Sequence, residues 1–494
     1  MSFGLALLSR AGITPDAPAI EGEDSTWTFA DLARHARRGA AHIVASVPPA
    51  TAPVAMLLPG DARFVGWLAA LSLAGRAALP LNARLTTDEL GQQLADARAC
   101  VLLGENGDSR LADLAIRLPG LTIVAVPRFE DLPDANGPLP GEEAADDALL
   151  VVLFTSGTSG RSKGACLSWS NFAASALAAA DPLGPAIAER WLACMPLFHV
   201  GGLSIVVRSV LFGGPIRLHS RFDAALVSDE LDAGDIAGIS LVPTMLWRLL
   251  DHRGPRPAPA GLQVLLLGGA AASPELLARA CLAGYPVCPT YGLTEATSQV
   301  ATARPQRLGA SRPPPMLPLP GVEVRIVVEG EDAAVGEPGE IVVGGPTVMQ
   351  GYLDDPVATA LALRDGWLHT GDIGFLDDAG GLHVLDRRDD LIVSGGENVY
   401  PAEIEAVLVG HPAVAEAGVA GVADADLGSR VVAWIVARDA ATVDPQELAE
   451  FCRAHLAGFK CPREFHLVSA LPRTAAGKLQ RRRLTDLPAS PIDC

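Results

Sequence analysis

Residues 153–168, LFTSGTSGRSKGACLS, combine glycines, hydroxyl side chains and two cations in one short stretch. Backbone amides of a glycine-rich turn can all point at one anion, and hydroxyl groups add donors without bulk. Lys163 and Arg161 supply positive charge beside these donors. The pattern therefore indicates a phosphate-binding loop; a flexible serine–glycine surface loop is the alternative interpretation.

The stretch differs from the familiar phosphate and nucleophile motifs. A Walker loop has glycine directly before its lysine, and here Ser162 occupies that position. A dinucleotide-binding GxGxxG pattern is absent from the stretch. Residues 160–164, GRSKG, spell GxSxG, but we do not interpret the stretch as a nucleophile elbow, so a serine hydrolase is disfavoured.

The elements around this loop predict an α/β fold. The apolar run ALLVVLF precedes the loop, and a helical pattern begins near Asn171. Short apolar runs such as VAMLLP, ACVLLG, LTIVAV, GISLV and LQVLLLGG alternate with helical patterns such as residues 29–46 and 62–75. This alternation predicts parallel sheets covered by helices.

The predicted secondary-structure pattern changes twice in the second half of the sequence. After residue 313, short strand patterns such as VEVRIVV and GEIVVGG predict a small β-rich subdomain at about 313–385. After DRRDD, the segments PAEIEAVLVG, RVVAWIVA and PQELAEFCRAHLAG predict a compact α+β module. We expect an N-terminal domain at 1–385, a hinge at 386–390 and a mobile C-terminal domain at 391–494.

Composition narrows the class of protein. The chain has 494 residues and a net charge of −19, without a basic tail or stripe, which argues against nucleic-acid binding. The eight cysteines lack zinc-like spacing and are interpreted as reduced, mostly packed thiols of a cytoplasmic protein. The longest uncharged apolar run, WLACMPLFHVGGLSIVV, contains Pro and His and predicts a buried segment rather than a membrane span.

Four further motifs follow the loop in a fixed order: YGLTEATSQ, GWLHTGDIG, DRRDDLIVSGGENVYPAEIE and LPRTAAGKLQRRRL. With these five motifs the chain resembles the adenylate-forming enzymes, which include acyl- and aryl-CoA synthetases, from about residue 20 to residue 485. Loops of that family usually carry Pro before the lysine, so Ser162 is a departure that could alter the stiffness of the loop.

The resemblance implies a reaction and its cofactors. A carboxylate attacks the α-phosphorus of ATP to give an acyl-adenylate, and the thiol of coenzyme A then displaces AMP. Because the first step brings an anion onto a polyanion, cations and Mg²⁺ must offset the repulsion.

The resemblance also implies residue roles. Glu295 would bind Mg²⁺, Thr294 would contact the α-phosphate, and Lys478 would bridge the substrate carboxylate and the α-phosphate. The β- and γ-phosphates would contact the loop residues, and the nucleoside would contact an aromatic ring, a carboxylate and a guanidinium group. These residues are Thr155, Ser156, Gly157, Thr158, Ser159, Gly160 and Lys163 for the phosphates, and Tyr291, Asp372 and Arg387 for the nucleoside. Taken singly, Lys478 could be a solvated cation of KLQRRR, Glu295 a helix-start carboxylate and Asp372 a turn former.

The second half-reaction is expected to need another domain orientation. In the family the small domain rotates about the hinge, here at Asp389, and replaces the lysine by a glycine loop that lines a pantetheine tunnel. Gly395 and Gly396 would allow the close approach of the thin ligand to the backbone.

The acyl pocket is predicted from PLFHVGGLSIVVRS, residues 196–209. By resemblance His199 flanks the substrate carboxylate; a satisfied core histidine is the alternative. Arg208, nine positions later on an apolar helical pattern, would pair with an anion if buried, or could extend to the surface. Gly268 and Gly269 could form a flat wall that admits a ring.

This pattern most resembles the family branch of menaquinone biosynthesis that activates o-succinylbenzoate, whose second carboxylate would pair with Arg208. A general aryl- or medium-chain acyl-CoA synthetase and a non-catalytic nucleotide-binding protein remain the alternatives. An amino-acid adenylation domain is disfavoured, because PLFHV offers no acidic residue for an ammonium group. We expect small-molecule partners, no nucleic acid and no stable membrane insertion; a homodimer is a possible assembly.

Overall fold

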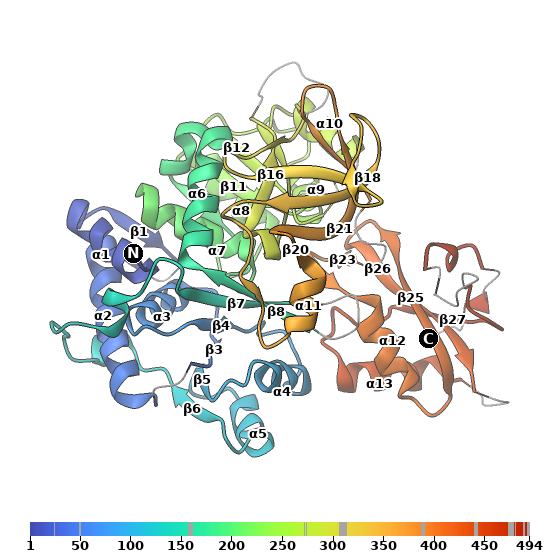
Figure 1. Cartoon of the computed structure of the whole chain (residues 1–494), viewed down its shortest axis with the longest axis horizontal. Helices are drawn as coiled ribbons and strands as arrows, with labels where there is room; N and C mark the ends of the chain where they lie inside the picture. Colours follow the sequence, from blue (N-terminus) through green and yellow to red (C-terminus); the bar gives the residue numbers. More distant parts are fainter. Residues whose placement is uncertain are drawn as a thin grey trace. The chain divides into compact units, whose positions relative to one another are not determined.

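The computed structural model describes residues 1–23, 25–48, 51–156, 162–270, 272, 274–305, 314–386, 391–438, 443–472, 479, 481–487 and 490–491. The chain forms two compact units (Figure 1). The first contains Met1–Ala83, Leu94–Leu153 and Gly164–Leu385, and the second contains Arg84–Gln93, Phe154–Lys163 and Asp386–Cys494.

A nine-stranded sheet of the first unit has the order β15-β14-β13-β12-β11-β9-β10-β1-β2. The pairings from β13 to β1 are parallel, whereas β14, β15 and β2 are antiparallel to their neighbours. The strands are β1 (Pro18–Glu21), β2 (Thr26–Thr28), β9 (Trp191–Ala193), β10 (Ile216–Leu218), β11 (Gly238–Leu241), β12 (Val264–Leu267), β13 (Val287–Leu293), β14 (Ser298–Thr302) and β15 (Leu317–Pro318).

Both faces of this sheet are buried. Along β12, Val264 and Leu266 belong to one apolar cluster, and Leu265 and Leu267 belong to another. Successive side chains of a strand point to opposite faces, so a strand with four buried apolar residues needs cover on both sides. This is why the strand reads as an uninterrupted apolar run in the sequence.

A second sheet has seven strands in the order β19-β8-β7-β4-β3-β5-β6. Its pairings β3–β4, β3–β5, β4–β7 and β5–β6 are parallel, and β19 is antiparallel to β8. The strands are β3 (Val54–Leu57), β4 (Ala78–Pro80), β5 (Val101–Gly104), β6 (Thr122–Ala125), β7 (Leu149–Ser156), β8 (Ser162–Ser168) and β19 (Gly351–Tyr352).

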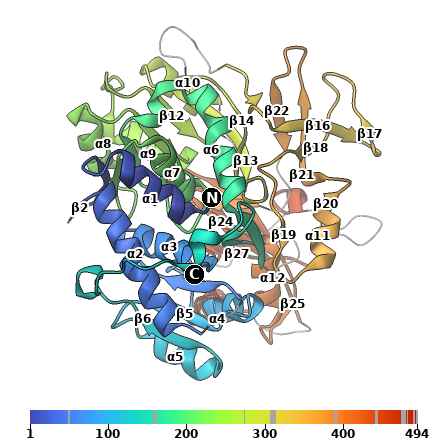
Figure 2. The same ribbon diagram turned by 60° about the vertical axis from the view of Figure 1, so that its left-hand side comes forward.

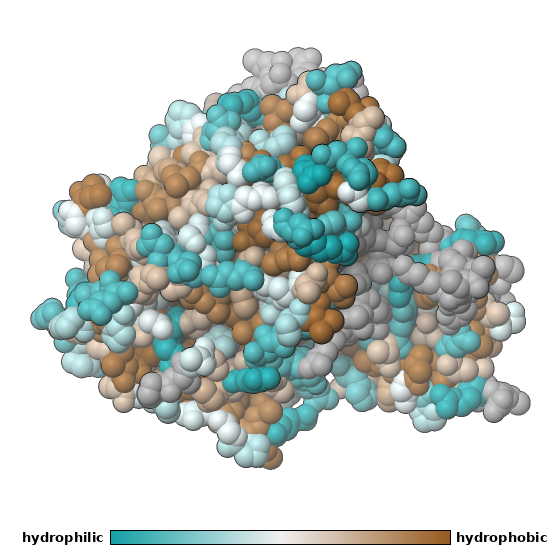
Figure 3. Space-filling model, in the orientation of Figure 1, coloured by the Kyte–Doolittle hydropathy of each residue, from teal (hydrophilic) through white to brown (hydrophobic). Residues whose placement is uncertain are grey.

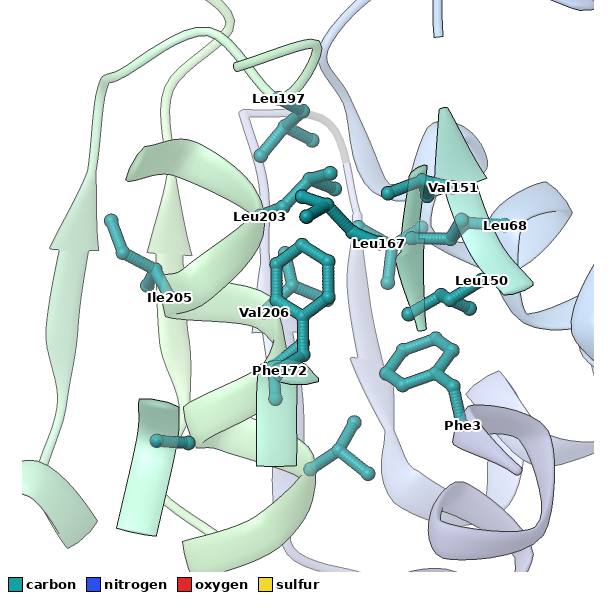
Figure 4. Close-up of a cluster of buried hydrophobic side chains, with 14 of the residues drawn as sticks. Phe3, Leu68, Leu150, Val151, Leu167, Phe172, Leu197, Leu203, Ile205 and Val206 are labelled. Atoms are coloured by element: carbon teal, nitrogen blue, oxygen red, sulfur yellow. The ribbon is translucent and has the colours of Figure 1, made fainter. Parts of the chain in front are cut away.

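Helices share one large core with these two sheets. In Figure 4, Phe172 of α6 and Leu203 and Val206 of α7 gather with Leu167 and Leu150 of the second sheet. The helices outside the C-terminal part are α1 (Phe3–Ile13), α2 (Phe29–Ser46), α3 (Ala62–Leu73), α4 (Thr87–Asp96), α5 (Arg110–Arg117), α6 (Trp169–Leu183), α7 (Val200–Phe212), α8 (Ala224–Ala233), α9 (Pro243–Arg253), α10 (Pro274–Leu282) and α11 (Pro356–Ala362). Short 3-10 helices are η1 (Phe129–Asp131), η2 (Pro140–Glu143), η3 (Gly184–Ala188) and η4 (Thr294–Ala296).

A third sheet of the first unit is built from strands that are near one another in the sequence, and its strands appear beside β14 in Figure 2. Its order is β17-β16-β18-β21-β20, with β22 paired to β21. The strands are β16 (Glu323–Val328), β17 (Glu331–Asp332), β18 (Gly339–Gly344), β20 (Leu363–Arg364), β21 (Trp367–Leu376) and β22 (Leu382–Asp386).

The C-terminal part of the second unit has a sheet of its own, in the order β24-β23-β26-β27-β28 with β25 paired to β26. A separate apolar cluster that includes Ile404, Val419 and Phe465 forms its core. The elements are β23 (Ile392–Ser394), β24 (Glu397–Val399), α12 (Pro401–Val409), β25 (Val414–Asp424), β26 (Gly428–Ala437), α13 (Pro445–His455), β27 (Glu464–Leu467), η5 (Arg481–Arg483) and β28 (Ser490–Pro491).

The predicted fold class is confirmed, and α2 covers the helix predicted at 29–46. One detail differs: the two ends of the loop motif TSGTSGRSKG belong to strands, residues 155–156 to β7 and residues 162–164 to β8. Within the described ranges, no helix combines the length and apolarity needed to cross a bilayer. Figure 3 shows hydrophilic and hydrophobic residues interspersed over the visible face.

Candidate active site

The glycine-rich stretch connects two neighbouring strands. Thr155 lies near the end of β7, and its Oγ1 donates to the carbonyl oxygen of Lys163 at the start of β8 over 3.4 Å. This hydrogen bond joins the two ends of the connection. Gly157, Thr158, Ser159, Gly160 and Arg161 lie outside the described residues, as does the side chain of Ser156.

The YGLTE motif forms the end of β13 and the tight connection to β14. A Cβ atom on Gly292 would lie 1.7 Å from the carbonyl oxygen of Ser298, so glycine is required there. Thr297 and Ser298 both have positive φ angles, 52° and 86°, which are uncommon for non-glycine residues. The Thr297 hydroxyl donates to the carbonyl oxygen of Thr347 over 2.6 Å, which helps to fix this backbone.

Glu295 lies in η4 within that connection and is only 8 % exposed. The hydroxyl of Tyr352, on β19, donates to Glu295 Oε1 over 2.8 Å. Thr294, the preceding residue, is half-buried. The structure therefore places the predicted metal-binding carboxylate in a fixed, largely buried position.

The donor set fits a magnesium ion that arrives with a nucleotide. Among the described residues, no group of three or more His, Cys, Asp or Glu side chains could bind a metal ion by itself. Mg²⁺ is usually bound through one or two carboxylates together with substrate phosphates, rather than in an all-protein cage. A single buried carboxylate such as Glu295 matches this mode.

Asp372 is directed inward by a bulge in β21. In the pairing with β18, Glu340 lies opposite Ile373 and Val342 lies opposite His369, so three residues of β21 face one residue of β18. Gly371 adopts a φ of +73° in this bulge. Bulges re-aim side chains in this way, and Asp372 is 8 % exposed although its neighbours on both sides are exposed.

Two predicted nucleoside-binding residues meet in the first unit. The Tyr291 hydroxyl donates to Asp372 Oδ2 over 2.7 Å. The backbone amide of Asp372 donates to the hydroxyl of Thr370 over 3.0 Å, and that hydroxyl donates to the carbonyl oxygen of Ile341. The carboxylate that was predicted to accept ribose hydroxyls is thus oriented by an aromatic neighbour and by its own strand.

His199 is the N-cap residue of α7 and is half-buried. Its ring lies 4.6 Å from the ring of Phe198, centroid to centroid. A Cβ atom on Gly202 would lie 2.3 Å from the carbonyl oxygen of Pro196, so the glycine lets the start of α7 pack against the PLFH segment. His199 is therefore no core histidine of an apolar helix face; it stands where the helix begins.

Arg208 lies inside the protein and does not extend to the surface. Its side chain is 3 % exposed and lies over the Trp191 ring, with 4.4 Å between the guanidinium carbon and the ring centroid. Burial lowers the pKa of the guanidinium to about 10. Because this value is still well above 7, the group stays charged at neutral pH. Its Nη1 donates to Gln299 Oε1 at 3.5 Å, and its Nη2 has no hydrogen-bond partner among the residues that the structure describes.

A chain of contacts connects Arg208 with the predicted glycine wall. Gln299 Nε2 donates to Thr302 Oγ1 over 2.9 Å, and Thr302 Oγ1 lies 2.8 Å from Thr290 Oγ1. A Cβ atom on Gly268 would lie 2.7 Å from Thr290 Cγ2. Gly268 and Gly269 directly follow β12, at the carboxyl end of the parallel strands, where α/β sheets commonly bind ligands.

The cavity beside Arg208 is small. It is lined by Trp191, Arg208, Ser209 and Ile216 among others, and its volume of about 10 Å³ suits roughly one water molecule. An aryl acid does not fit in this space. This cavity by itself is therefore not the space that would hold the acid.

The local backbone conformation also explains why glycine occupies positions 395 and 396, in addition to the ligand approach inferred from the motif. They form the two-residue connection between β23 and β24, with φ angles of +58° and +86°. Two successive positive φ angles are required by a type I′ hairpin turn, for which glycine is strongly preferred. The catalytic candidate Lys478 and the ribose candidate Arg387 lie outside the described residues.

Models of known protein families match both parts of the chain. The model described as AMP-binding enzyme matches residues 8–353, and the model described as AMP-binding enzyme C-terminal domain matches residues 403–478. The first match alone covers well over half of the chain. The chain belongs to the AMP-binding enzyme family. The resemblance predicted from the five ordered motifs is thereby confirmed.

Several members of the AMP-binding enzyme family are similar to this chain in sequence, and some of them have solved structures. A 2-succinylbenzoate–CoA ligase of Geobacillus kaustophilus is 41 % identical and covers 97 % of both chains. A double mutant of the o-succinylbenzoate CoA synthetase of Bacillus subtilis, bound with a product analogue, superposes with a TM-score of 0.91 at 37 % identity over 99 % of both chains. The same enzyme in complex with ATP and a magnesium ion gives a TM-score of 0.72 at 36 % identity, covering 98 % of this chain and all of that one.

Two residues with evident contacts in the site were missed by the sequence analysis. Tyr352 contacts Glu295, although 57 positions separate them in the chain. Gln299 contacts Arg208 across 91 positions. Gln299 stands in the quoted YGLTEATSQ motif and was available as a signal; Tyr352 lies in no motif that was considered, and only the fold brings it to Glu295.

Proposed function

We propose that this protein is an ATP-dependent carboxylic acid–CoA ligase of the AMP-forming type, with o-succinylbenzoate as its acid. The observation that carries the proposal is similarity over nearly the whole chain to 2-succinylbenzoate–CoA ligases. The inward-facing Glu295 and the Tyr291–Asp372 pair support the nucleotide half of the reaction.

In the first half-reaction the substrate carboxylate attacks the α-phosphorus of ATP, the bond to the bridging oxygen breaks, and pyrophosphate leaves. Asp372 accepts hydrogen bonds from the ribose hydroxyls, and Tyr291 orients the Asp372 carboxylate and lies along the adenine. Arg387 assists at the ribose. Thr294 contacts the α-phosphate, and the hydroxyl and amide groups of the 155–160 loop bind the outer phosphates together with Lys163.

Glu295 would bind the magnesium ion, which supplies positive charge that offsets repulsion between the anionic reactants. Lys478 adds a second positive charge between the substrate carboxylate and the α-phosphate. Preorganised charges of this kind are worth more in a water-excluded site than in bulk solvent.

In the second half-reaction the thiol of coenzyme A attacks the acyl carbon and AMP leaves with the bonding electron pair. We assign residues 386–390 as the hinge that lets the C-terminal domain exchange Lys478 for the Gly395–Gly396 turn between the two steps. A homodimer and a cytoplasmic location stay predictions.

Arg208 is proposed to select dicarboxylic acids. A buried guanidinium with an unpartnered nitrogen favours an incoming anion, and the Gln299–Thr302–Thr290 contacts lead from it to the Gly268 wall. His199, at the start of α7, would flank the carboxylate that reacts. The aryl carboxylate would then lie toward Arg208 and the aliphatic one toward the nucleotide.

The test is a panel of carboxylic acids with ATP and coenzyme A, in which pyrophosphate release and coenzyme A consumption are followed together. We expect both signals with o-succinylbenzoate and weaker signals with monocarboxylic aryl and medium-chain acids. Equal rates across the panel would support a general acyl-CoA synthetase. Pyrophosphate without thioester would indicate another acceptor, and neither signal would indicate a non-catalytic nucleotide-binding protein.

A further inference from the structure

Glu295 is contacted by a segment that none of the recognised motifs includes. Tyr352 Oη donates to Glu295 Oε1 over 2.8 Å, and both residues are 8 % exposed. A hydrogen bond from a neutral donor to a carboxylate is charge-assisted and is stronger than one between neutral groups. The contact is therefore suited to fix the orientation of the carboxylate.

The same segment binds the backbone of the Glu295 turn. The amide of Met349 donates to the carbonyl oxygen of Glu295 over 2.9 Å, and the Thr297 hydroxyl donates to the carbonyl oxygen of Thr347. Asn171 of α6 donates through Nδ2 to the carbonyl oxygens of Pro346 and Val348. Residues 346–352 are thus held at several points, so the Tyr352 ring starts from a well-anchored backbone.

At its other end the segment pairs with the strand that leaves the glycine-rich loop. Tyr352 and Gly351 of β19 lie opposite Ala165 and Cys166 of β8 in an antiparallel pairing. The amide of Leu353 also donates to the carbonyl oxygen of Gly164 over 2.8 Å. Because β8 begins at Ser162, Tyr352 connects the Glu295 carboxylate to a strand that continues directly from the proposed phosphate loop.

We propose that Tyr352 is a positioning residue for the metal: its hydroxyl fixes the Glu295 carboxylate in the rotamer that binds the magnesium ion of Mg·ATP. The inference rests on the proposed function, since it takes Glu295 as a metal ligand. A carboxylate oxygen can accept more than one interaction, so the hydrogen bond leaves capacity for an ion. Partners of this kind orient metal ligands, and their loss typically costs about 10- to 100-fold in metal affinity.

The test is Tyr352→Phe, which keeps the buried ring and removes only the hydroxyl. Binding of α,β-methylene ATP, which cannot be cleaved at the α–β linkage, is measured by calorimetry with magnesium and again in EDTA. We expect the variant to bind the analogue about tenfold more weakly than wild type in magnesium and equally well in EDTA. In steady-state assays, the magnesium concentration for half-maximal rate should rise, and excess magnesium should restore turnover.

The matched control is Tyr285→Phe, which removes the hydroxyl of a fully buried tyrosine that belongs to a separate apolar cluster. It should leave both affinities unchanged. If Tyr352→Phe weakens binding equally in EDTA, or has no effect in magnesium, Tyr352 does not act through the metal and the inference is wrong. Wild-type enzyme that binds the analogue with magnesium but turns over no acid would refute the proposed function and leave the Tyr352 inference standing.

Discussion

Arg208 places a positive charge in a core that is otherwise built from apolar helix and strand residues. Its guanidinium group lies over the Trp191 ring and donates to the Gln299 carbonyl group, and Glu189 lines the same small cavity. A buried charge without a full set of partners destabilises the folded state. We therefore interpret Arg208 as a residue that costs stability and is kept for ligand binding.

Replacing Arg208 by methionine tests this interpretation. Arg208→Met should unfold at a higher temperature than wild type, with an unfolding free energy increased by about 1 kcal/mol or more, because apolar replacements of buried charges are often stabilising. The same variant should lose its preference for o-succinylbenzoate over a monocarboxylic analogue. A variant that is destabilised and still selective would contradict both parts.

The pKa of Arg208 sets the expected pH dependence of this preference. Burial lowers the pKa of Arg208 from its usual range to about 10, so the charge is disfavoured in the folded state. Its cost to stability is relieved only as the pH rises through about 10. From neutral pH up to about pH 9 the guanidinium stays protonated. The acid preference of the wild-type enzyme should therefore be constant over that range.

Single residues were predictable to different degrees. Glu295 and Asp372 stand in motifs with a fixed order, so the family resemblance identified them before their positions in the fold were known. Tyr352 could not be predicted, because its role depends on the pairing of β19 with β8 and not on neighbouring residues. For Arg208, the sequence left burial and surface exposure equally open, and packing of α7 against the sheet decided between them.

At the scale of elements, the β13–β14 connection positions Thr294 and Glu295 through backbone geometry. Gly292 is the residue that permits it, since any side chain there would overlap the carbonyl oxygen of Ser298. The predicted parallel strands and the helix at 29–46 follow from apolar periodicity. The bulge before Asp372 and strand β8 do not, because both depend on pairing with residues far away in the sequence.

Gly292→Ala tests the importance of this connection. The Cβ atom would force β13 and β14 apart and displace Glu295, so acid-dependent pyrophosphate release should fall by at least about tenfold. Gly120→Ala is the matched control, because no atom lies within 4 Å of a Cβ there. It should retain wild-type activity. A Gly292→Ala enzyme with normal activity would show that the turn tolerates displacement.

At the scale of the whole molecule, the two half-reactions are assigned to residues near opposite ends of the C-terminal sequence. Gly395 and Gly396 form a hairpin turn near its start, and Lys478 lies near its end. The domain boundary was predicted from the change in secondary-structure pattern after residue 390. The conformational exchange itself comes from the family resemblance and stays a prediction.

Lys478→Ala should separate the two half-reactions. Pyrophosphate release should fall by about a hundredfold or more, because a charge at the reacting centre is lost. Thioester formation from chemically supplied acyl-adenylate should continue at a near wild-type rate. Arg483→Ala removes an exposed cation from the same basic cluster and should leave both rates unchanged. Equal losses in the two variants would mean that the cluster acts only through its general charge.

Gln299 presents a carboxamide to Arg208, and the identity of that group matters. Its nitrogen is occupied by Thr302, so the oxygen must face the guanidinium. An amide dipole steadies a cation without neutralising it, whereas a glutamate in the same place would form an internal salt and remove the attraction for an incoming acid. If Arg208 binds the second carboxylate as proposed, Gln299 keeps the guanidinium charge available to it. Gln299→Glu would then be expected to weaken binding of a dicarboxylic acid.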